Sequence, residues 1–303
     1  MKFYKTDLET ITMEETQLFI PMTMIVVAQK LYGENNKSFT CSINCMWSLV
    51  TKGKINLTKT KRIELVELFK QYLGKNDLTW EDDIEFDYYE TDENYTVLNI
   101  QDINNIFIEE KRFDKVANKL AIVLGLHTYM DGSCVYLSKE ELVMEVSPQH
   151  ESRIDMNNPK TWFMTATHKQ LELISSKFVA FPTMETLLTK RHNEDKNEYS
   201  QPLMTEVSFN KYIKELEELG IICKVNTKYG SHGNKAVYCR VEHKEVCEAL
   251  YERLDELKQM AKKHKNNEIE EVKEEAPVEK VSFKDVVGDK KEPISKRPRP
   301  KFN

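Results

Sequence analysis

The 303-residue chain contains few of the residues that form the tight turns between the strands of all-β proteins. It has only 9 glycines and 9 prolines, whereas a sandwich of short strands needs turn residues between all of them. Hydrophobic residues still make up 40% of the chain and aromatic residues 10%, enough for real cores. These numbers exclude an all-β fold with a turn every ten residues and favour a mainly helical protein.

Long hydrophobic runs are also missing from the sequence. The most apolar stretch, Phe19–Ala28, is about half as long as the ~20 residues that cross a bilayer. The polar start, Met1–Asp7, does not suit a secretory signal. We therefore expect a cytoplasmic protein with no membrane segment, whose six cysteines stay reduced.

Signatures of catalysis and metal binding are lacking as well. No phosphate loop, HExxH motif or Ser-His-Asp order stands out. Cys41 and Cys45 have no further ligands at metal-site spacing, and Cys223 and Cys239 could face each other across two strands. The acidic run Glu81–Asp87 does not resemble a two-metal site, which draws acids from separated strands, so we interpret it as a solvated or partner-binding face. We expect no catalytic residue, metal or cofactor.

The net charge of −6 by itself argues against nucleic-acid binding, but the distribution of the charges along the chain matters more than their sum. Residues 76–110 hold 12 acids and no base, residues 1–75 hold 11 bases and 7 acids, and residues 160–265 hold 18 bases and 15 acids. Two basic regions thus flank one acidic segment. The first basic region contains a cluster of five bases without acids: Lys52, Lys54, Lys59, Lys61 and Arg62. Two interpretations of this cluster stay open, a second DNA contact and a plain solvated face.

Residues 1–130 are predicted to form an N-terminal winged-helix-like domain. Helices are expected over Ile20–Leu31, from a cap at Ser42 through Val50, and from a cap at Thr58 or Thr60 through Leu73, which Gly74 closes. Tyr95–Ile100 then alternates like a strand. The expected order is therefore three helices and a strand hairpin, followed by a connecting segment over residues 131–160.

Residues 161–263 are predicted to form a C-terminal winged helix-turn-helix domain. Helices are expected over His168–Phe181, Thr183–Arg191 and Val207–Leu219, the last with Ser208 as a cap and Val207 on its buried face. Asn193–Pro202 is predicted to be a polar loop, Ile221–Val225 and Ala236–Val241 are predicted strands around a basic tip, and Glu245–Lys263 is a further helix. Residues 264–303 are charged and expected to be disordered. The fold class is thus mainly α with short β-hairpins, arranged as tandem winged helices.

The second domain carries the DNA-binding hypothesis. In a helix-turn-helix, the second helix lies in the major groove; here Thr183–Arg191 would support Glu206–Gly220. Polar residues near the start of the reading helix could meet bases: Thr205, Ser208, Asn210, Lys211 and Lys214. The hairpin after it would contact phosphates through Lys224, Lys228, His232, Lys235 and Arg240.

Two phrases, FPTMETLLTKRH at residues 181–192 and FNKYIKELEELGII at residues 209–222, carry a family resemblance. Together with the following hairpin, they resemble the winged-helix replication initiators and replisome organisers of plasmids and phages of low-GC Gram-positive bacteria. This resemblance covers about 60 residues, and the Asn193–Pro202 insertion departs from the usual tight turn.

The resemblance implies a non-catalytic protein, associated with the nucleoid or a plasmid, that binds origin repeats in double-stranded DNA. It also implies recruitment of a host helicase, a helicase loader or other replication proteins through the tail. A winged-helix transcriptional regulator is the alternative, and a protein-interaction scaffold is a second one. The helix Glu245–Lys263 would form the interface of a homodimer.

Overall fold

The computed structural model describes residues 1–4, 8, 13–33, 38–87, 94–132, 134–146, 155, 157–181, 192–193, 198–199, 204–229 and 235–274. The chain divides into two compact units, Met1–Leu257 and Lys258–Asn303. As expected, it is mainly helical with small antiparallel sheets. The predicted supporting helix Thr183–Arg191 lies outside the described residues, and so do His232 of the hairpin tip and residues 275–303 of the predicted tail.

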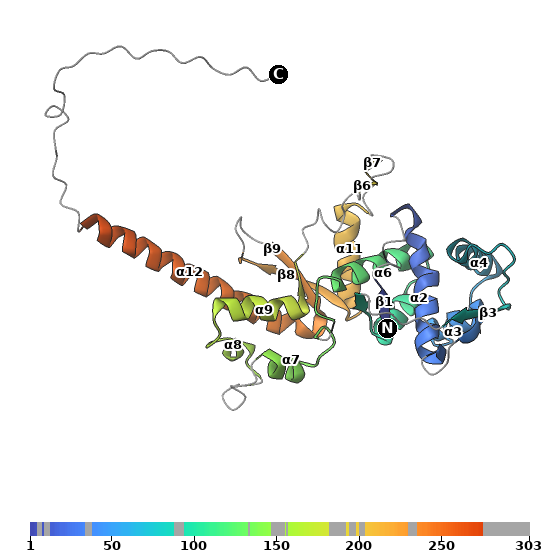
Figure 1. Cartoon of the computed structure of the whole chain (residues 1–303), viewed down its shortest axis with the longest axis horizontal. Coiled ribbons are helices and arrows are strands. Elements are labelled where there is room, and N and C mark those ends of the chain that lie inside the picture. The colour runs from blue at the N-terminus through green and yellow to red at the C-terminus, as the bar shows by residue number, and fades with distance from the viewer. Residues whose placement is uncertain are drawn as a thin grey trace, which may run out of the picture. The chain divides into compact units, whose positions relative to one another are not determined.

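The first half of the unit Met1–Leu257 is a group of helices packed around α2 (Figure 1). Contacts join α2 to α3, α4 and α6, and α5 packs against α3 and α6. In chain order the elements are β1 (Lys2–Tyr4), a 3-10 helix η1 (Met13–Leu18), α2 (Phe19–Ala28), a π-helical turn η2 (Gln29–Gly33), β2 (Ser38–Ser42), α3 (Ile43–Thr51), α4 (Lys59–Leu73), β3 (Asp83–Asp87), β4 (Tyr95–Val97), α5 (Ile100–Glu109) and α6 (Phe113–His127).

Two of these helices begin at predicted caps; α4 ends at the predicted residue, and α3 ends one residue later than predicted, at Thr51. The Ser42 hydroxyl accepts a hydrogen bond from the Cys45 backbone N–H at 3.2 Å and caps α3. Of the two candidates for α4, Thr58 is the cap. Gly74 ends α4 in the left-handed conformation, with φ +63°, as its freedom from a Cβ allows.

The strand hairpin expected in the first half is not what the structure shows. Strand β3 pairs with β2, and β4 pairs with β1. The β2–β3 register places Phe39 opposite Phe86 and Cys41 opposite Ile84, so that one apolar face packs on the helices. Helix α5 was not predicted either.

The second half of this unit surrounds a three-stranded sheet. Its elements are α7 (Lys139–Val146), α8 (Pro159–Trp162), α9 (His168–Phe178), β5 (Val179–Ala180), β6 (His192–Asn193), β7 (Glu198–Tyr199), α11 (Glu206–Glu218), β8 (Ile222–Thr227), β9 (Lys235–Arg240), η4 (Val241–His243) and α12 (Lys244–Glu274). The strand order is β5-β9-β8, all antiparallel. No helix in the described ranges is long and apolar enough to cross a membrane.

Three predicted boundaries in the second half need correction. The helix expected over His168–Phe181 ends at Phe178, because the next two residues pair with β9 as strand β5. The loop expected over Asn193–Pro202 contains β7, which pairs with β6. Disorder was expected from His264, but α12 continues to Glu274; its Lys- and Glu-rich continuation consists of good helix formers, although it has no apolar face.

The sheet β5-β9-β8 lies between two groups of buried side chains, and its pleat sorts them. Ala180, Ile222 and Tyr238 join the core of the first half, together with the inner face of α11. Their neighbours along the strands, such as Cys239, point the other way and join α9 and α12. One buried cluster therefore crosses the predicted boundary at residue 130.

A buried ion pair also joins the two halves. The Arg240 guanidinium, on β9, donates to Asp102, on α5, at 2.5 Å, and to Glu242 at 2.7 Å. It also lies over the Tyr136 ring, 4.4 Å from the centroid. Arg240 and Asp102 are 7% and 5% exposed, so loss of one partner leaves a charge in a poorly hydrated place.

We predict that Asp102→Asn lowers the free energy of unfolding by about 3 kcal/mol, because it removes the main countercharge of buried Arg240. Urea denaturation measures this. The double variant Asp102→Leu with Arg240→Met should cost clearly less than the sum of the single variants, since neither charge then stays buried alone. Additive losses would contradict the coupling.

Candidate nucleic-acid interface

Helix α11 presents one face to solvent and buries the opposite one. Phe209, Ile213 and Leu216 form its buried face. The residues that follow one another at helical spacing on the outer face are all exposed: Val207, Lys211, Lys214 and Glu218. The first three lie in the first two-thirds of the helix, so its start presents one apolar and two cationic side chains.

The polar residues predicted at the start of α11 are mostly engaged in local contacts. Thr205, rather than Ser208, is the cap: its hydroxyl accepts from the Ser208 N–H at 3.2 Å and donates to the Ser208 hydroxyl at 3.0 Å. The Asn210 amide N–H donates to the Glu206 carbonyl at 3.1 Å, and its oxygen accepts from Lys224 at 3.1 Å. Asn210 and Lys224 thus come together, one from α11 and one from β8.

The hairpin brings two of its predicted cations to one end. Thr227 pairs with Lys235 at the last described step of the ladder, so Lys228 and Lys235 both lie next to the tip. Both are exposed, and neither has a carboxylate partner among the described residues. His232 falls outside them.

The prediction for Arg240 is wrong. Its guanidinium is buried and paired with Asp102 and Glu242, so it cannot reach a phosphate. The sequence pattern did not show this because Arg240 and Asp102 are far apart in the chain.

Acids in the second half of α11 are largely neutralised by other elements. The Glu215 carboxylate lies 2.9 Å from the ammonium of buried Lys119 on α6, and Glu217 lies 2.7 Å from Lys244. Glu215, Glu217 and Glu218 would repel phosphate if they were free, but of these three only Glu218 is exposed. The interface is therefore more cationic than the sequence of α11 suggests.

The N-terminal basic cluster separates into two groups. Lys52, Lys54 and Lys59 are exposed, although Lys52 donates to the Gln101 side chain at 2.7 Å. Lys61 pairs with Glu64 at 2.6 Å and lies over the Phe113 ring. Arg62 donates to the Leu57 carbonyl and lies over the Trp80 ring, 5.5 Å from its centroid. Arg62 is also exposed and lines one groove with Lys59, whereas Lys52, Lys54 and Lys61 lie outside that lining.

Val207 is the functional candidate that the sequence analysis missed. It was placed on the buried face, but it is 80% exposed. Its spacing of four and seven residues from Lys211 and Lys214 is the signal that could have placed it on the outer face instead. An exposed aliphatic side chain at the start of such a helix can contact a thymine methyl group.

Five of the six cysteines are buried, and Cys45 is half-buried. The prediction that Cys223 and Cys239 face each other is confirmed: they are directly paired across β8 and β9, with their sulfurs 3.6 Å apart, as free thiols. Within the described residues, no group of three or more His, Cys, Asp or Glu side chains is arranged to hold a metal ion.

Comparisons with models of protein families, with curated proteins and with solved structures find no match for this chain.

A buried histidine, His127, lies beside the Arg240 ion pair. The His127 ring is 2% exposed, and its Nδ1 lies 3.1 Å from the Val97 carbonyl oxygen. Burial, together with the cationic Arg240, lowers the pKa of His127 from about 6.5 to about 3. His127 is therefore neutral at neutral pH.

We predict that acidification destabilises the fold through His127. The unfolded chain binds a proton at this residue below pH 6.5, whereas the folded chain does not until about pH 3. Stability should therefore fall as pH drops below 6.5, by about 1.4 kcal/mol per pH unit, or about 2 kcal/mol at pH 5. His127→Gln should lose less stability than the unaltered chain between pH 7 and pH 5 in urea titrations. Equal losses would contradict the assignment.

Proposed function

We propose that this chain is a sequence-specific double-stranded DNA-binding protein without a catalytic role, and that α11 enters the major groove. The observation that carries this proposal is the outer face of α11: Val207, Lys211 and Lys214 are exposed in one row. Lys211 also lies 4.0 Å from Glu215, whose other oxygen faces Lys119. The hairpin that follows α11 in the chain ends in two exposed cations, Lys228 and Lys235, which have no carboxylate partner among the described residues. Exposed cations beside a helix of this kind suit phosphate contacts and base readout.

The order of elements supports this proposal. Helix α9 leads into the short strand β5, α11 leads into the hairpin β8–β9, and β5 pairs with β9 to give the order β5-β9-β8. This is the sheet order of a winged helix, in which α11 would be the recognition helix and the β8–β9 hairpin the wing. The first half does not share this strand pairing, so the proposal concerns one winged helix only.

The residues then take separate roles. Lys211 and Lys214 would reach guanine edges or phosphates, and Val207 would contact a thymine methyl group. Asn210 can pair adenine only if it releases Lys224, with which it bonds in this structure. Lys228 and Lys235 would hold the phosphate backbone, a contribution that does not depend on sequence.

We further propose that the protein acts in replication initiation on a plasmid or phage. This step is supported by the resemblance at residues 181–192 and 209–222 and by the cationic end of the chain, where residues 290–301 hold six bases and one acid. Genome-wide mapping of bound sites tests it: an initiator protects repeated sites beside its own gene, and its removal lowers plasmid copy number. Protection of promoters alone, with unchanged copy number, would instead identify a transcriptional regulator.

We predict that Lys211→Ala with Lys214→Ala relaxes sequence preference, at a cost of ~1–3 kcal/mol for each lost base contact. The ratio of Kd for the selected site to Kd for random DNA, measured at one salt concentration, reports this loss. Lys169→Ala is the matched control, because Lys169 is an exposed lysine on α9, across the sheet from α11. An unchanged ratio in the double variant would remove α11 as the reading helix.

We predict a different effect for the hairpin. Lys228→Ala with Lys235→Ala should weaken binding to all sequences alike, because phosphate contacts carry no base information. The slope of log Kd against log salt should fall by about 2, since each phosphate contact contributes ~0.9. If the salt slope of this variant stays at the value of the Lys169→Ala control, the hairpin does not contact the backbone.

A further inference from the structure

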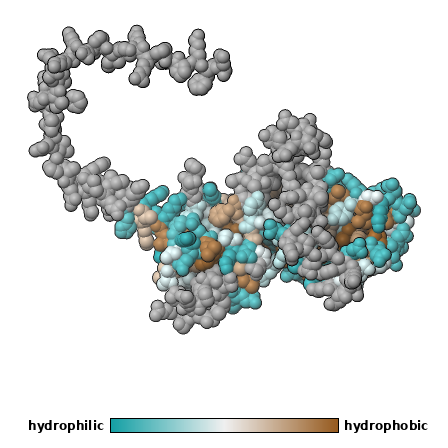
Figure 2. Space-filling model, in the orientation of Figure 1, coloured by the Kyte–Doolittle hydropathy of each residue, from teal (hydrophilic) through white to brown (hydrophobic). Residues whose placement is uncertain are grey.

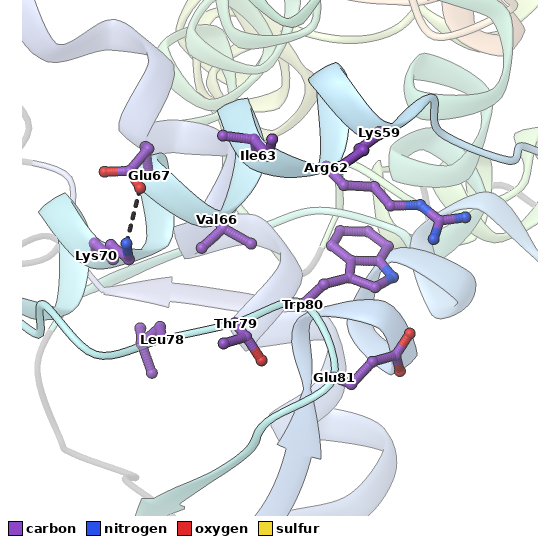
Figure 3. A pocket seen from close by; sticks show the side chains of 10 residues that line it. All are labelled: Lys59, Arg62, Ile63, Val66, Glu67, Lys70, Leu78, Thr79, Trp80 and Glu81. Atoms are coloured by element: carbon purple, nitrogen blue, oxygen red, sulfur yellow. Dashed lines mark hydrogen bonds and ion pairs between the residues drawn. The ribbon is translucent and has the colours of Figure 1, made fainter.

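A groove lies beside α4, on the side of the unit away from α11. It has a volume of about 490 Å³ and runs between α4 and the segment that leads into β3. Its apolar lining consists of Ile63 and Val66 from α4 and Leu78 and Trp80 from the segment opposite, as Figure 3 shows. Ile63 is 55% exposed. Figure 2 shows hydrophobic surface among hydrophilic residues where Figure 1 places α4.

The wall of this groove that faces α4 is held in place by hydrogen bonds. The Trp80 carbonyl accepts from the Asn44 backbone N–H at 3.1 Å, and the Asn44 side chain donates to Glu81 at 3.0 Å. The Thr79 N–H donates to the Asp82 carboxylate at 2.9 Å. The segment is thus bonded to Asn44 of α3 at Trp80 and Glu81 and is closed on itself by the Thr79–Asp82 bond. A site that needs no rearrangement pays less ordering entropy on binding.

The charges around the groove are uneven. Glu67 and Lys70 neutralise each other at 2.8 Å. Lys59 and Arg62 line the same groove, and among the described residues neither has a carboxylate partner. Arg62 is held over the Trp80 ring (Figure 3), so a planar cation stands at the edge of an apolar slot. This combination suits a ligand with a bulky apolar group next to one carboxylate.

A nucleic acid strand fits the groove less well than a peptide does. Glu81 lines the wall opposite α4, and Asp82 and Asp83 follow it with exposed side chains. A strand that carries a phosphate at every nucleotide would have to pass these carboxylates. A peptide can place a single carboxylate at Lys59 and Arg62 and avoid them.

We propose that this groove docks a protein partner through a segment with one large apolar side chain beside an Asp or Glu. The apolar side chain fills the slot between Val66, Leu78 and Trp80, and the carboxylate pairs with Arg62 and Lys59. This surface is separate from the DNA-binding face of α11, so it does not depend on the proposed function. It assigns Lys59 and Arg62, from the predicted second DNA contact, to protein recognition.

Fluorescence of the full chain can test this with small probes. Trp47 and Trp162 are only 4% and 3% exposed, so a probe in the groove should change mainly the emission of Trp80. We expect 3-phenylpropionate, which joins a phenyl ring to a carboxylate, to saturate in the millimolar range, as its size allows. Phenethylamine, with the same ring and the opposite charge, should bind at least tenfold more weakly, and propionate should not saturate.

Variants of the full chain then locate the probe. Arg62→Gln should weaken 3-phenylpropionate at least fivefold, whereas Lys75→Gln, an exposed lysine outside the groove, should leave it unchanged. Trp80→Phe should remove the emission change while NMR of the probe still reports binding. Urea denaturation checks that each variant is folded.

Three outcomes would overturn the proposal. Equal binding of phenethylamine and 3-phenylpropionate would show that the cations do not select a carboxylate. Absence of saturation by 3-phenylpropionate would show that the slot takes no such group. Binding of single-stranded oligothymidylate that quenches Trp80 and is lost in Arg62→Gln, without binding of 3-phenylpropionate, would identify a nucleic acid site instead.

Discussion

The ion pair between Arg240 and Asp102 is the interaction on which the arrangement of the chain depends most. Arg240 ends the central strand of the sheet β5-β9-β8, and Asp102 belongs to a helix of the first half. A buried guanidinium tolerates little loss of its partners, so β9 and α5 must stay together. Because α11 packs on the same sheet, its position relative to the first half is constrained as well.

Helix α11 is shared between three environments. Its inner face packs on the sheet, its side contacts α6 through Tyr212 and Glu215, and its outer face is exposed. The contact with α6 has an electrostatic consequence, because Lys119 neutralises the acid nearest to Lys211. The charge of the outer face therefore arises partly from a helix almost a hundred residues earlier in the chain.

Local signals made much of the fold predictable. The caps at Ser42 and Thr58, the glycine end of α4 and the apolar spacing in α11 depend on neighbouring residues, and they were found. Apart from the β8–β9 hairpin, strand pairing was not found, because two- and three-residue strands such as β5 and β4 carry no periodicity of their own. The burial of Arg240 depends on a contact between distant segments, and the groove at Trp80 depends on how the chain folds back along α4 after Gly74. A single sequence shows neither. Val207 was misplaced because an apolar residue in an amphipathic helix was assumed to face inward.

The contacts of α11 with both halves also bear on whether the second half can fold without the first. A fragment that starts in the predicted connecting segment, residues 131–160, would keep the sheet and its hairpin. It would lose Asp102, the buried partner of Arg240, and α6, which covers one side of α11. Arg240 and that side of α11 would then be exposed to water. We therefore expect that the part of the chain proposed to read DNA does not fold as an independent domain. Its packing is tied to the first 130 residues through Asp102 and α6.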